Sequence, residues 1–340
     1  MRRRRPASVL LLASVLVAAS LSGAAVAATP DGPVAADDSR LASADVVVGT
    51  GTPASCTSRA VVRAVARGGV IRFACGPGPV TIAMRRTAKV VNTSARVVLD
   101  GGGLVTLSGR GQRRILYLNT CDRAQVWTTP HCDDQAEPRL VVRGMRLVAG
   151  DATGQATDGG GGGAIFARGG RLAIIDSEFV GNRCDRTGPD VGGGAVRVLD
   201  QHRDRPVVVR RSVFRDGRCS NGSALSSIGV SWHVTGSTFT GNRAIGLGAN
   251  PARPGTPGGG SGGAVYLDGN DIHLVVEDTT MTGNHAREGG GAIFFVSNDR
   301  TGTLTVRGSQ LVDNPSEGFE TIPGIFFLGA RRDVVDSVVR

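Results

Sequence analysis

The chain has 340 residues, of which 51 are glycine, about twice the usual share, and only 4% are aromatic. The hydrophobic content of 40% is too high for a disordered chain, and the glycines follow no strict three-residue period, which excludes a collagen helix. Lys and Arg, 39 residues together, outnumber the 29 Asp and Glu residues, for a formal net charge of +10. They are scattered, and aromatics that could stack on bases are few, so no nucleic-acid partner is expected.

The N-terminus has the pattern of a secretory signal peptide. Arginines occupy positions 2–5, an apolar run covers 9–21, and the small-x-small site Ala25-Val26-Ala27 follows. The apolar run is shorter than the roughly 20 residues of a membrane span, and an uncleaved anchor is the alternative. We expect cleavage of residues 1–28 and a mature chain that has no transmembrane segment and is secreted, extracellular or associated with the cell surface.

The segment after the signal peptide, 29–55, is rich in Ala, Asp, Pro and Gly and is expected to be a flexible leader. Residues 58–67 then show the spacing of a short amphipathic helix. Thr57 or Ser58 is its expected N-cap, and a Gly-Gly pair ends it. This helix is predicted to close the N-terminal end of the domain at 56–340, because the first unit of a repeat array needs a cap.

The six cysteines are even in number and lie in a chain that is expected to be exported, which indicates disulfides. The most local pairing, one of several that six cysteines allow, is Cys56–Cys75, Cys121–Cys132 and Cys184–Cys219. No metal site is expected, since the sequence has no Cys-x-x-Cys motif and no histidine pair at helical spacing.

Two short signatures recur along the chain and mark internal repeats. The first is Gly-Gly-Ala followed by an apolar residue, and its copies begin at Gly162, Gly193, Gly262 and Gly290, with a degraded copy at Gly222. The second signature is Ser/Thr-x-apolar-x-x-Asn, in which x is any residue. Its copies end at Asn182, Asn242, Asn284 and Asn314. Short alternating β-rich stretches lie between them. Such units cannot bury their own apolar faces, so we expect an all-β, right-handed, single-stranded parallel β-helix with one repeat per coil.

Equivalent positions of successive repeats are expected to stack in columns. An apolar column is predicted inside the core, formed by Phe179, Phe214, Phe239, Met281 and Leu311. The asparagines that end the second signature are predicted to form a ladder that satisfies backbone groups of neighbouring coils. Two insertions, 121–138 and 246–258, break the period and are expected to be surface loops that can carry binding specificity.

The pair of signatures resembles the repeats of chlamydial polymorphic outer-membrane proteins, over five coils between residues 159 and 314. The opening of the domain, from Cys56 through ARGGVIRFACGPGPVTI to LDGGGLVTLSG, looks like the N-terminal part of secreted pectate-lyase-like β-helix proteins. The first resemblance implies a surface-displayed adhesin, and the second implies lyases and hydrolases of acidic polysaccharides. The Asn-Thr-Asp, Gly-His-Gly and Arg-Ile-Lys signatures of polygalacturonase-like enzymes are missing.

A candidate binding site follows from the alternation in the strand after each Gly-Gly-Ala. The first strand residue is expected to point inward and the second outward, which gives an outward column of Phe166, Arg197, Tyr266 and Phe294, with coils about 4.8 Å apart. Such a row can stack on sugar rings while Arg197 pairs a uronate carboxylate. The alternatives are that a loop covers the row or that a bulge turns it inward.

Weaker candidates for catalysis are Arg197, Asp200 and Asp268. A lyase needs a base that removes the proton next to a carboxylate and a cation, often Ca²⁺, that neutralises the enolate. Because the acids do not cluster in sequence, solvated surface charges are the simpler interpretation. We therefore expect a monomer that binds a polysaccharide or a cell-surface partner without catalysis and without a cofactor. The alternative is a lyase or hydrolase of uronate polysaccharide.

Overall fold

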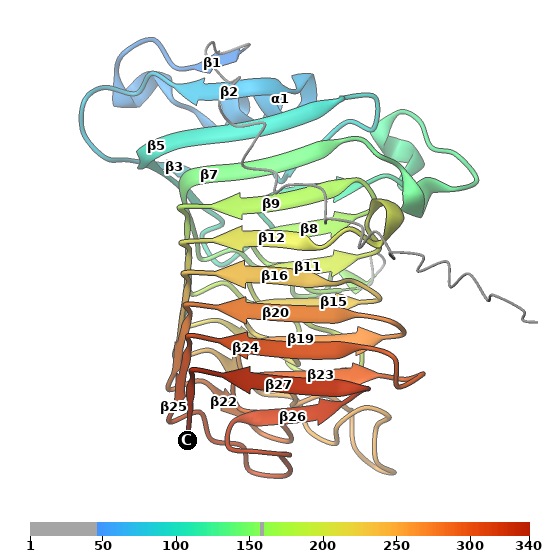
Figure 1. Cartoon of the computed structure of the whole chain (residues 1–340). Helices are drawn as coiled ribbons and strands as arrows, with labels where there is room; N and C mark the ends of the chain where they lie inside the picture. Colours follow the sequence, from blue (N-terminus) through green and yellow to red (C-terminus); the bar gives the residue numbers. More distant parts are fainter. Residues whose placement is uncertain (1–45, 157–159) are drawn as a thin grey trace, which may run out of the picture.

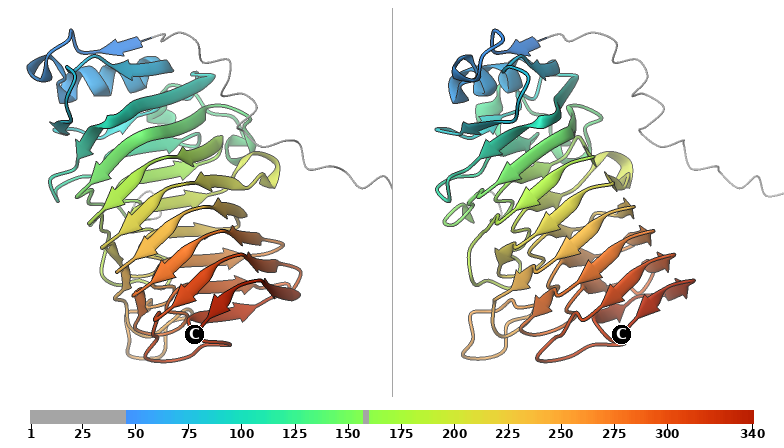
Figure 2. Two further views of the ribbon diagram at one scale, coloured as in Figure 1. Left: turned by 60° about the vertical axis from the view of Figure 1, so that its left-hand side comes forward. Right: turned by 90° about the vertical axis from the view of Figure 1, so that its left-hand side faces the viewer.

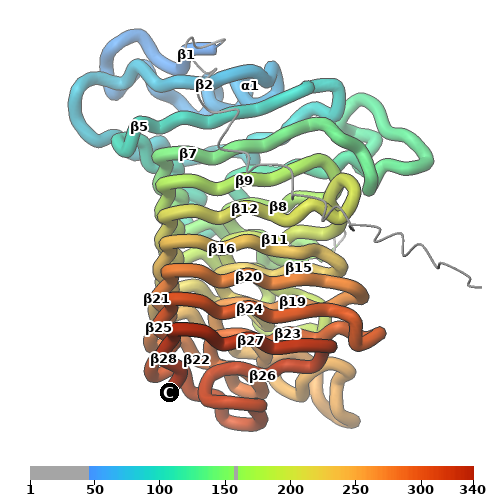
Figure 3. The backbone as a smooth tube through the Cα atoms, in the orientation of Figure 1, coloured from blue at the N-terminus to red at the C-terminus, as the bar shows by residue number. Residues whose placement is uncertain are grey.

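The computed structural model describes residues 46–156 and 160–340, which form the predicted parallel β-helix (Figure 1). The expected signal peptide at 1–28 lies outside the described residues. Strands of neighbouring coils pair in parallel, so each coil lies on the one before it from the N-terminal helix to the C-terminal coil (Figures 2 and 3).

One face of the β-helix is an eight-stranded parallel sheet. In spatial order its strands are β4 (Ala88–Lys89), β6 (Leu116–Asn119), β8 (Ile165–Arg168), β11 (Val196–Leu199), β15 (Leu225–Ile228), β19 (Val265–Gly269), β23 (Ile293–Ser297) and β26 (Ile325–Leu328).

The other faces belong to a 17-stranded sheet, in which two stacks share the long strands β5 (Arg96–Ser108) and β7 (Arg139–Val148). Besides these two, the first stack holds β1 (Val46–Val48), β2 (Gly69–Phe73), β9 (Arg171–Ile175), β12 (Val207–Arg210), β16 (Trp232–Thr235), β20 (His273–Glu277), β24 (Thr303–Arg307) and β27 (Arg331–Val335). The second stack adds β3 (Val80–Ala83), β10 (Glu178–Val180), β13 (Val213–Arg215), β17 (Thr238–Thr240), β21 (Thr280–Thr282), β25 (Gln310–Val312) and β28 (Val338–Val339). A separate three-stranded sheet consists of β14 (Arg218–Cys219), β18 (Arg243–Ala244) and β22 (His285–Ala286).

The Gly-Gly-Ala signature lies at the corner before a strand of the eight-stranded sheet. Gly193 has a φ of +76° and Gly262 a φ of +68°, a region that L side chains rarely adopt. A Cβ on Gly193 would also lie 2.3 Å from the carbonyl oxygen of Val196. The corner therefore requires glycine both for its backbone angle and for its close approach to the next strand.

Both predicted columns are confirmed. The rings of Phe179, Phe214 and Phe239 stack with centroids 4.7 and 4.9 Å apart, inside the core. The Asn242 side-chain amide donates to the Asn284 side-chain carbonyl at 2.8 Å, and the Asn284 amide donates to Asn314 at 2.8 Å. Each amide also donates to a backbone carbonyl of the preceding coil, so the ladder ties four coils together, from that of Phe214 to that of Asn314.

The predicted capping helix is confirmed as α1 (Ser58–Arg67), and Thr57 is its N-cap, with a side chain that accepts from the Ala60 amide at 3.2 Å. The expectation of a flexible leader is wrong for residues 46–55. There β1 pairs with β2, and a 3-10 helix at Pro53–Ser55 precedes Cys56. Residues 46–55 belong to the folded domain, because Val48 is buried in the core and the β1 backbone pairs with β2.

The three predicted disulfides, Cys56–Cys75, Cys121–Cys132 and Cys184–Cys219, are confirmed. Cys121, Cys132 and Asp133 lie close enough together to suggest metal ligands, but both thiols are already joined in a disulfide. In the described part of the chain, no helix has the length and the apolar character that a membrane crossing requires.

Candidate functional site

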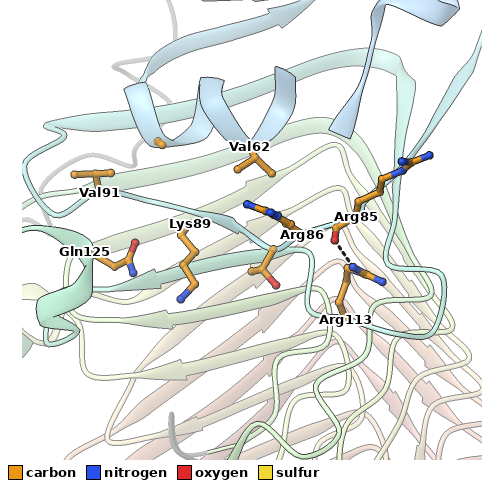
Figure 4. A pocket seen from close by; sticks show the side chains of 9 residues that line it. Val62, Arg85, Arg86, Lys89, Val91, Arg113 and Gln125 are labelled. Carbon is orange, nitrogen blue, oxygen red and sulfur yellow. Dashed lines mark hydrogen bonds between the residues drawn. The ribbon is translucent and has the colours of Figure 1, made fainter. Parts of the chain in front are cut away.

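A cationic pocket of about 540 Å³ lies between α1 and the first coils (Figure 4). Its lining residues come from α1, from the turn between β3 and β4, from β4 and from the segments on either side of β6: Val62, Ala66, Arg85, Arg86, Thr87, Lys89, Val91, Arg113 and Gln125. Four of the nine are cations, and none carries a carboxylate.

The turn that carries the arginines is held from two sides. The Ser58 hydroxyl at the start of α1 accepts a hydrogen bond from the Arg85 amide at 2.9 Å. Arg113 donates to the Arg85 carbonyl, the contact dashed in Figure 4. The Thr87 hydroxyl donates to the Arg114 carbonyl at 2.9 Å. Hydrogen bonds to α1 and to the segment before β6 hold the turn, so tertiary contacts determine the backbone position of Arg85 and Arg86.

Lys89, the chain's only lysine, ends β4 and lies over an aromatic ring. Its register partner in β6 is Tyr117, and its Nζ lies 4.9 Å from the Tyr117 ring centroid, a cation–π contact. Tyr117 is fixed in turn by stacking on Phe166 and by a hydrogen bond from its hydroxyl to Asp122 at 3.2 Å. The ring therefore serves as a rigid support for the ammonium group.

The charge of the cationic pocket is not neutralised by neighbouring side chains. In residues 46–156 and 160–340, none of Arg85, Arg86, Lys89 and Arg113 lies within 4.0 Å of a carboxylate oxygen, and Arg113 Nε has no hydrogen-bond partner. Other arginines of the β-helix are paired: Arg211 bonds Asp176 at 2.7 Å. Four like charges around one concave surface raise the local concentration of anions.

The insertion at 121–138 forms one rim of the cationic pocket. Gln125 lies in a 3-10 helix, Arg123–Gln125, inside the loop that the Cys121–Cys132 disulfide closes. The backbone amide of Asn92, next to the lining residue Val91, donates to the Gln125 carbonyl at 3.0 Å. This insertion was predicted to be a surface loop that can carry specificity, and the structure places it beside the pocket.

The predicted outward column is buried, so the expectation that it forms an exposed binding surface is wrong. Phe166, Arg197, Tyr266 and Phe294 are at most 3% exposed. The predicted alternation nevertheless holds, because the residue before each of them belongs to the central core while the column itself does not. The column lies on the outer face of the sheet, beneath other segments of the chain.

Irregular segments between the coils cover the column. Asn250, in the insertion at 246–258, donates to the Tyr266 hydroxyl at 3.0 Å, and Phe319 meets Phe294 edge-on at a centroid distance of 6.3 Å. Arg197 donates to the backbone carbonyl of Asp190 at 2.5 Å and to the Ser226 hydroxyl at 2.6 Å. These side chains have partners within the protein and are not available to a polymer in solution.

Burial changes the acid–base behaviour of this column. It lowers the pKa of Arg197 to about 10, although the nearby Tyr266, Asp190 and Asp268 oppose the effect. Burial, with the charge of Asp268, raises the pKa of Tyr266 well above its ordinary value. Tyr266 therefore stays protonated and acts as a hydrogen-bonding group of the interior.

The three candidate catalytic residues do not form one cluster. Asp268, in β19, is near Arg197, whereas Asp200 follows β11 and is separated from Asp268 by the coil of β15. Asp268 accepts hydrogen bonds from the Asn250 and Asn298 amides. Asp200 instead lies 3.5 Å from the guanidinium of Arg168. Burial raises the pKa of Asp200, although the charge of Arg168 acts to lower it.

The sequence did not predict that Asp133 and Asp200 contact the same arginine, Arg168. Asp133, from the insertion at 121–138, lies 3.3 Å from Nη2 of the same Arg168, and Asp134 pairs with His202 at 2.9 Å. The insertion thus packs onto the coil that carries Asp200. The sequence holds no periodic signal for this meeting, because an insertion has no counterpart in the other coils.

The pocket cations were also missed, although the sequence carries a signal for them. Asp100 is the only acidic residue between Asp45 and Asp122, whereas eleven Lys and Arg residues lie in the same stretch. This local excess of positive charge indicates an anion-attracting N-terminal region. Treating the arginines as scattered over the whole chain concealed it.

Comparison with known proteins finds one likeness. Residues 278–296 match the family model of the Chlamydia polymorphic membrane protein (Chlamydia_PMP) repeat. They run from the end of one coil, with Met281 of the core column and Asn284 of the ladder, through Gly-Gly-Ala into β23. No curated protein and no solved structure matches the chain. Over these residues, the chain is similar to that repeat.

Proposed function

We propose that this chain is an exported β-helix protein that binds an acidic partner at the cell surface or outside the cell, without catalysis. The observation that carries the proposal is the cationic pocket, in which Arg85, Arg86, Lys89 and Arg113 surround one space without a carboxylate among its lining residues. Exposed cations of this kind form pairs with carboxylate, sulfate or phosphate groups, and guanidinium does so bidentately.

The scaffold and the N-terminal sequence support this proposal. The turn that carries Arg85 and Arg86 is held by hydrogen bonds to Ser58 and to the Arg114 carbonyl, so little ordering is needed on binding. The signal-peptide pattern at 1–28 favours export, and the repeat that matches residues 278–296 is described as belonging to a membrane protein. Surface association, as an adhesin-like monomer, is the location and state that we propose.

The proposal is tested with the mature chain, residues 29–340, and immobilised polymers: polygalacturonate, dextran sulfate and neutral dextran. The variant Arg85→Gln/Arg86→Gln removes two pocket charges, and Arg186→Gln/Arg243→Gln removes two exposed charges elsewhere as the matched control. At about 0.5–1 kcal/mol per exposed charge contact, we expect the pocket variant to weaken binding to the acidic polymers roughly 5- to 30-fold. Equal effects of the two variants, or equal binding to neutral dextran, would contradict a pocket-specific site.

A polysaccharide lyase or hydrolase is the second candidate function, and one observation favours it. Arg168 lies between Asp133 and Asp200, and the pKa of Asp200 is raised by burial, as suits a general acid or base. Incubation with polygalacturonate, with and without Ca²⁺, tests it through unsaturated products and new reducing ends. Turnover that is lost in Asp200→Asn would replace the binding proposal by an enzymatic one.

A further inference from the structure

We propose that the ligand of the cationic pocket is an acidic saccharide and that Trp127, on the Cys121–Cys132 loop, is the platform on which its sugar ring stacks. This inference rests on the proposed function, because it names the class of acidic partner and the residue that distinguishes it. An acidic peptide would use the cations alone, whereas a sugar acid offers both an anionic group and an apolar ring face.

Trp127 is unusual in this chain because it is exposed. The protein has two tryptophans, and Trp232 is only 1% exposed within the core, whereas Trp127 is 53% exposed. Its neighbour Val126 is 67% exposed, so two large apolar side chains lie together at the tip of one loop. A contiguous exposed apolar surface is typical of a contact site for a ligand or a partner, and these two residues are neighbours in sequence.

The loop that carries Trp127 is anchored beside the cationic pocket. The side-chain amide of Asn92 donates to the Trp127 carbonyl at 2.8 Å, and also to the carbonyls of Thr120 and Asp122. Asn92 is buried and directly follows Val91, which lines the pocket, and Gln125 lines the pocket two residues before Trp127. One buried amide thus fixes the tryptophan backbone to the pocket wall.

The backbone of the loop is held in an unfavourable conformation at its tip. Val126 has a φ of +82°, a region that β-branched residues avoid because of steric clashes. The Cys121–Cys132 disulfide and the 3-10 helix, capped by the Asp122 side chain on the Ala124 amide at 2.9 Å, hold the chain in place around it. Such strain persists where the surrounding structure imposes it, and it is concentrated at ligand sites.

The two halves of the site match the two halves of a sugar acid. The flat indole packs against the C–H face of a pyranose ring, which adds contact area at low conformational cost. The guanidinium groups of Arg85 and Arg86 and the Lys89 ammonium donate hydrogen bonds to the carboxylate or sulfate that the ring carries. Uronate and sulfated saccharides share this chemistry, and the experiment tests both.

The single lysine makes occupancy of the pocket directly measurable. In the mature chain, Lys89 is the only side-chain amine, so its reductive methylation, read by peptide mass spectrometry, reports access to the pocket. The probes are oligogalacturonate, a sulfated oligosaccharide, a neutral galactose oligomer and polyglutamate of matched charge. We expect both acidic saccharides to protect Lys89 and to change tryptophan fluorescence, since Trp232 is buried and Trp127 is accessible.

The decisive variant is Trp127→Ala, with Trp127→Phe as the conservative partner and Val334→Ala as a control at a distant exposed apolar residue. We expect Trp127→Ala to weaken acidic-saccharide binding at least 10-fold, Trp127→Phe to restore most of it, and polyglutamate binding to stay unchanged. An acidic-saccharide affinity within twofold of the wild type in Trp127→Ala would overturn the inference. Protection by polyglutamate equal to that by the saccharides would overturn it as well.

The outcomes separate this inference from the function on which it rests. If Arg85→Gln/Arg86→Gln weakens binding while Trp127→Ala does not, the pocket binds anions but the aromatic platform is wrong. If no acidic probe protects Lys89 and the arginine variant has no effect, the proposed function itself fails.

Discussion

The hydroxyl of Ser58 at the first turn of α1 accepts a hydrogen bond of 2.9 Å from the backbone amide of Arg85, a residue of the next coil. This one contact joins the capping helix to the turn that carries two pocket cations. The cap therefore does more than cover the apolar end of the core, because it also fixes the geometry of the cationic pocket.

Ser58→Ala removes this contact and leaves the Arg85 amide without its partner. We expect a loss of about 1–2 kcal/mol in the free energy of unfolding, because a hydrogen bond to a largely buried side chain is lost. Urea denaturation measures it. Thr52→Ala is the control, because Thr52 is exposed and its side chain makes no capping hydrogen bond to the 3-10 helix that follows it. A Ser58 variant as stable as its control would show that α1 does not depend on this contact.

Asn284→Ala interrupts the asparagine ladder at its centre. The Asn284 side chain accepts from Asn242 and donates to Asn314 and to the Phe239 carbonyl, all within the protein interior. Several buried polar groups lose a partner at once, so we expect a loss of about 3 kcal/mol or more. The comparison is Asn270→Ala, at an exposed asparagine, where thermal unfolding should change little. A small effect at Asn284 would mean that water replaces the ladder.

Glu288→Gln tests an ion pair that holds the insertion at 246–258. Arg253 bonds both carboxylate oxygens of Glu288 at 2.7 Å, and the Gly248 amide donates to it as well. Burial alone would raise the pKa of Glu288, but these hydrogen bonds outweigh it and lower the pKa below its ordinary 4.5. A carboxylate with a lowered folded-state pKa stabilises the protein above its unfolded-state pKa and loses that effect as the pH falls.

We therefore expect the wild type to exceed Glu288→Gln in stability at pH 7, with a difference that shrinks as the pH falls below about 4.5. Denaturant titrations of both proteins between pH 3 and 7 measure this difference. A constant difference across that range would contradict an ionised Glu288 as the anchor of the insertion.

Removal of the Cys121–Cys132 disulfide, in Cys121→Ser/Cys132→Ser, tests the loop that carries Trp127. The bond spans 11 residues, and its loss costs about 3 kcal/mol at most on a chain-entropy model. Because the loop is then free to move, we expect acidic-saccharide binding to weaken as in Trp127→Ala. Cys184→Ser/Cys219→Ser removes a distant disulfide and should lower stability without changing the saccharide affinity. Equal affinity losses in both variants would indicate general unfolding instead.

The fold could be predicted from the sequence because its causes repeat. Three features recur once per coil: glycine at the corner, an apolar residue equivalent to Phe179 in the core, and an asparagine of the ladder that ends at Asn314. Because the same local pattern is repeated, it identifies the parallel β-helix. The capping helix and the three disulfides followed from equally local signals. These features depend on neighbours in sequence or on the same position in the next coil.

The site could not be predicted in the same way. Alternation correctly placed Tyr266 on the outer face of its sheet, but its burial depends on Asn250, which lies in an insertion without a periodic counterpart. The cationic pocket likewise needs Arg85, Lys89 and Arg113 from separate segments, which only the docking of α1 and the pairing of β4 with β6 bring together. Periodic residues are positioned by the coil itself, whereas insertions and caps are positioned by contacts between segments distant in sequence, and those contacts exist only in the folded protein.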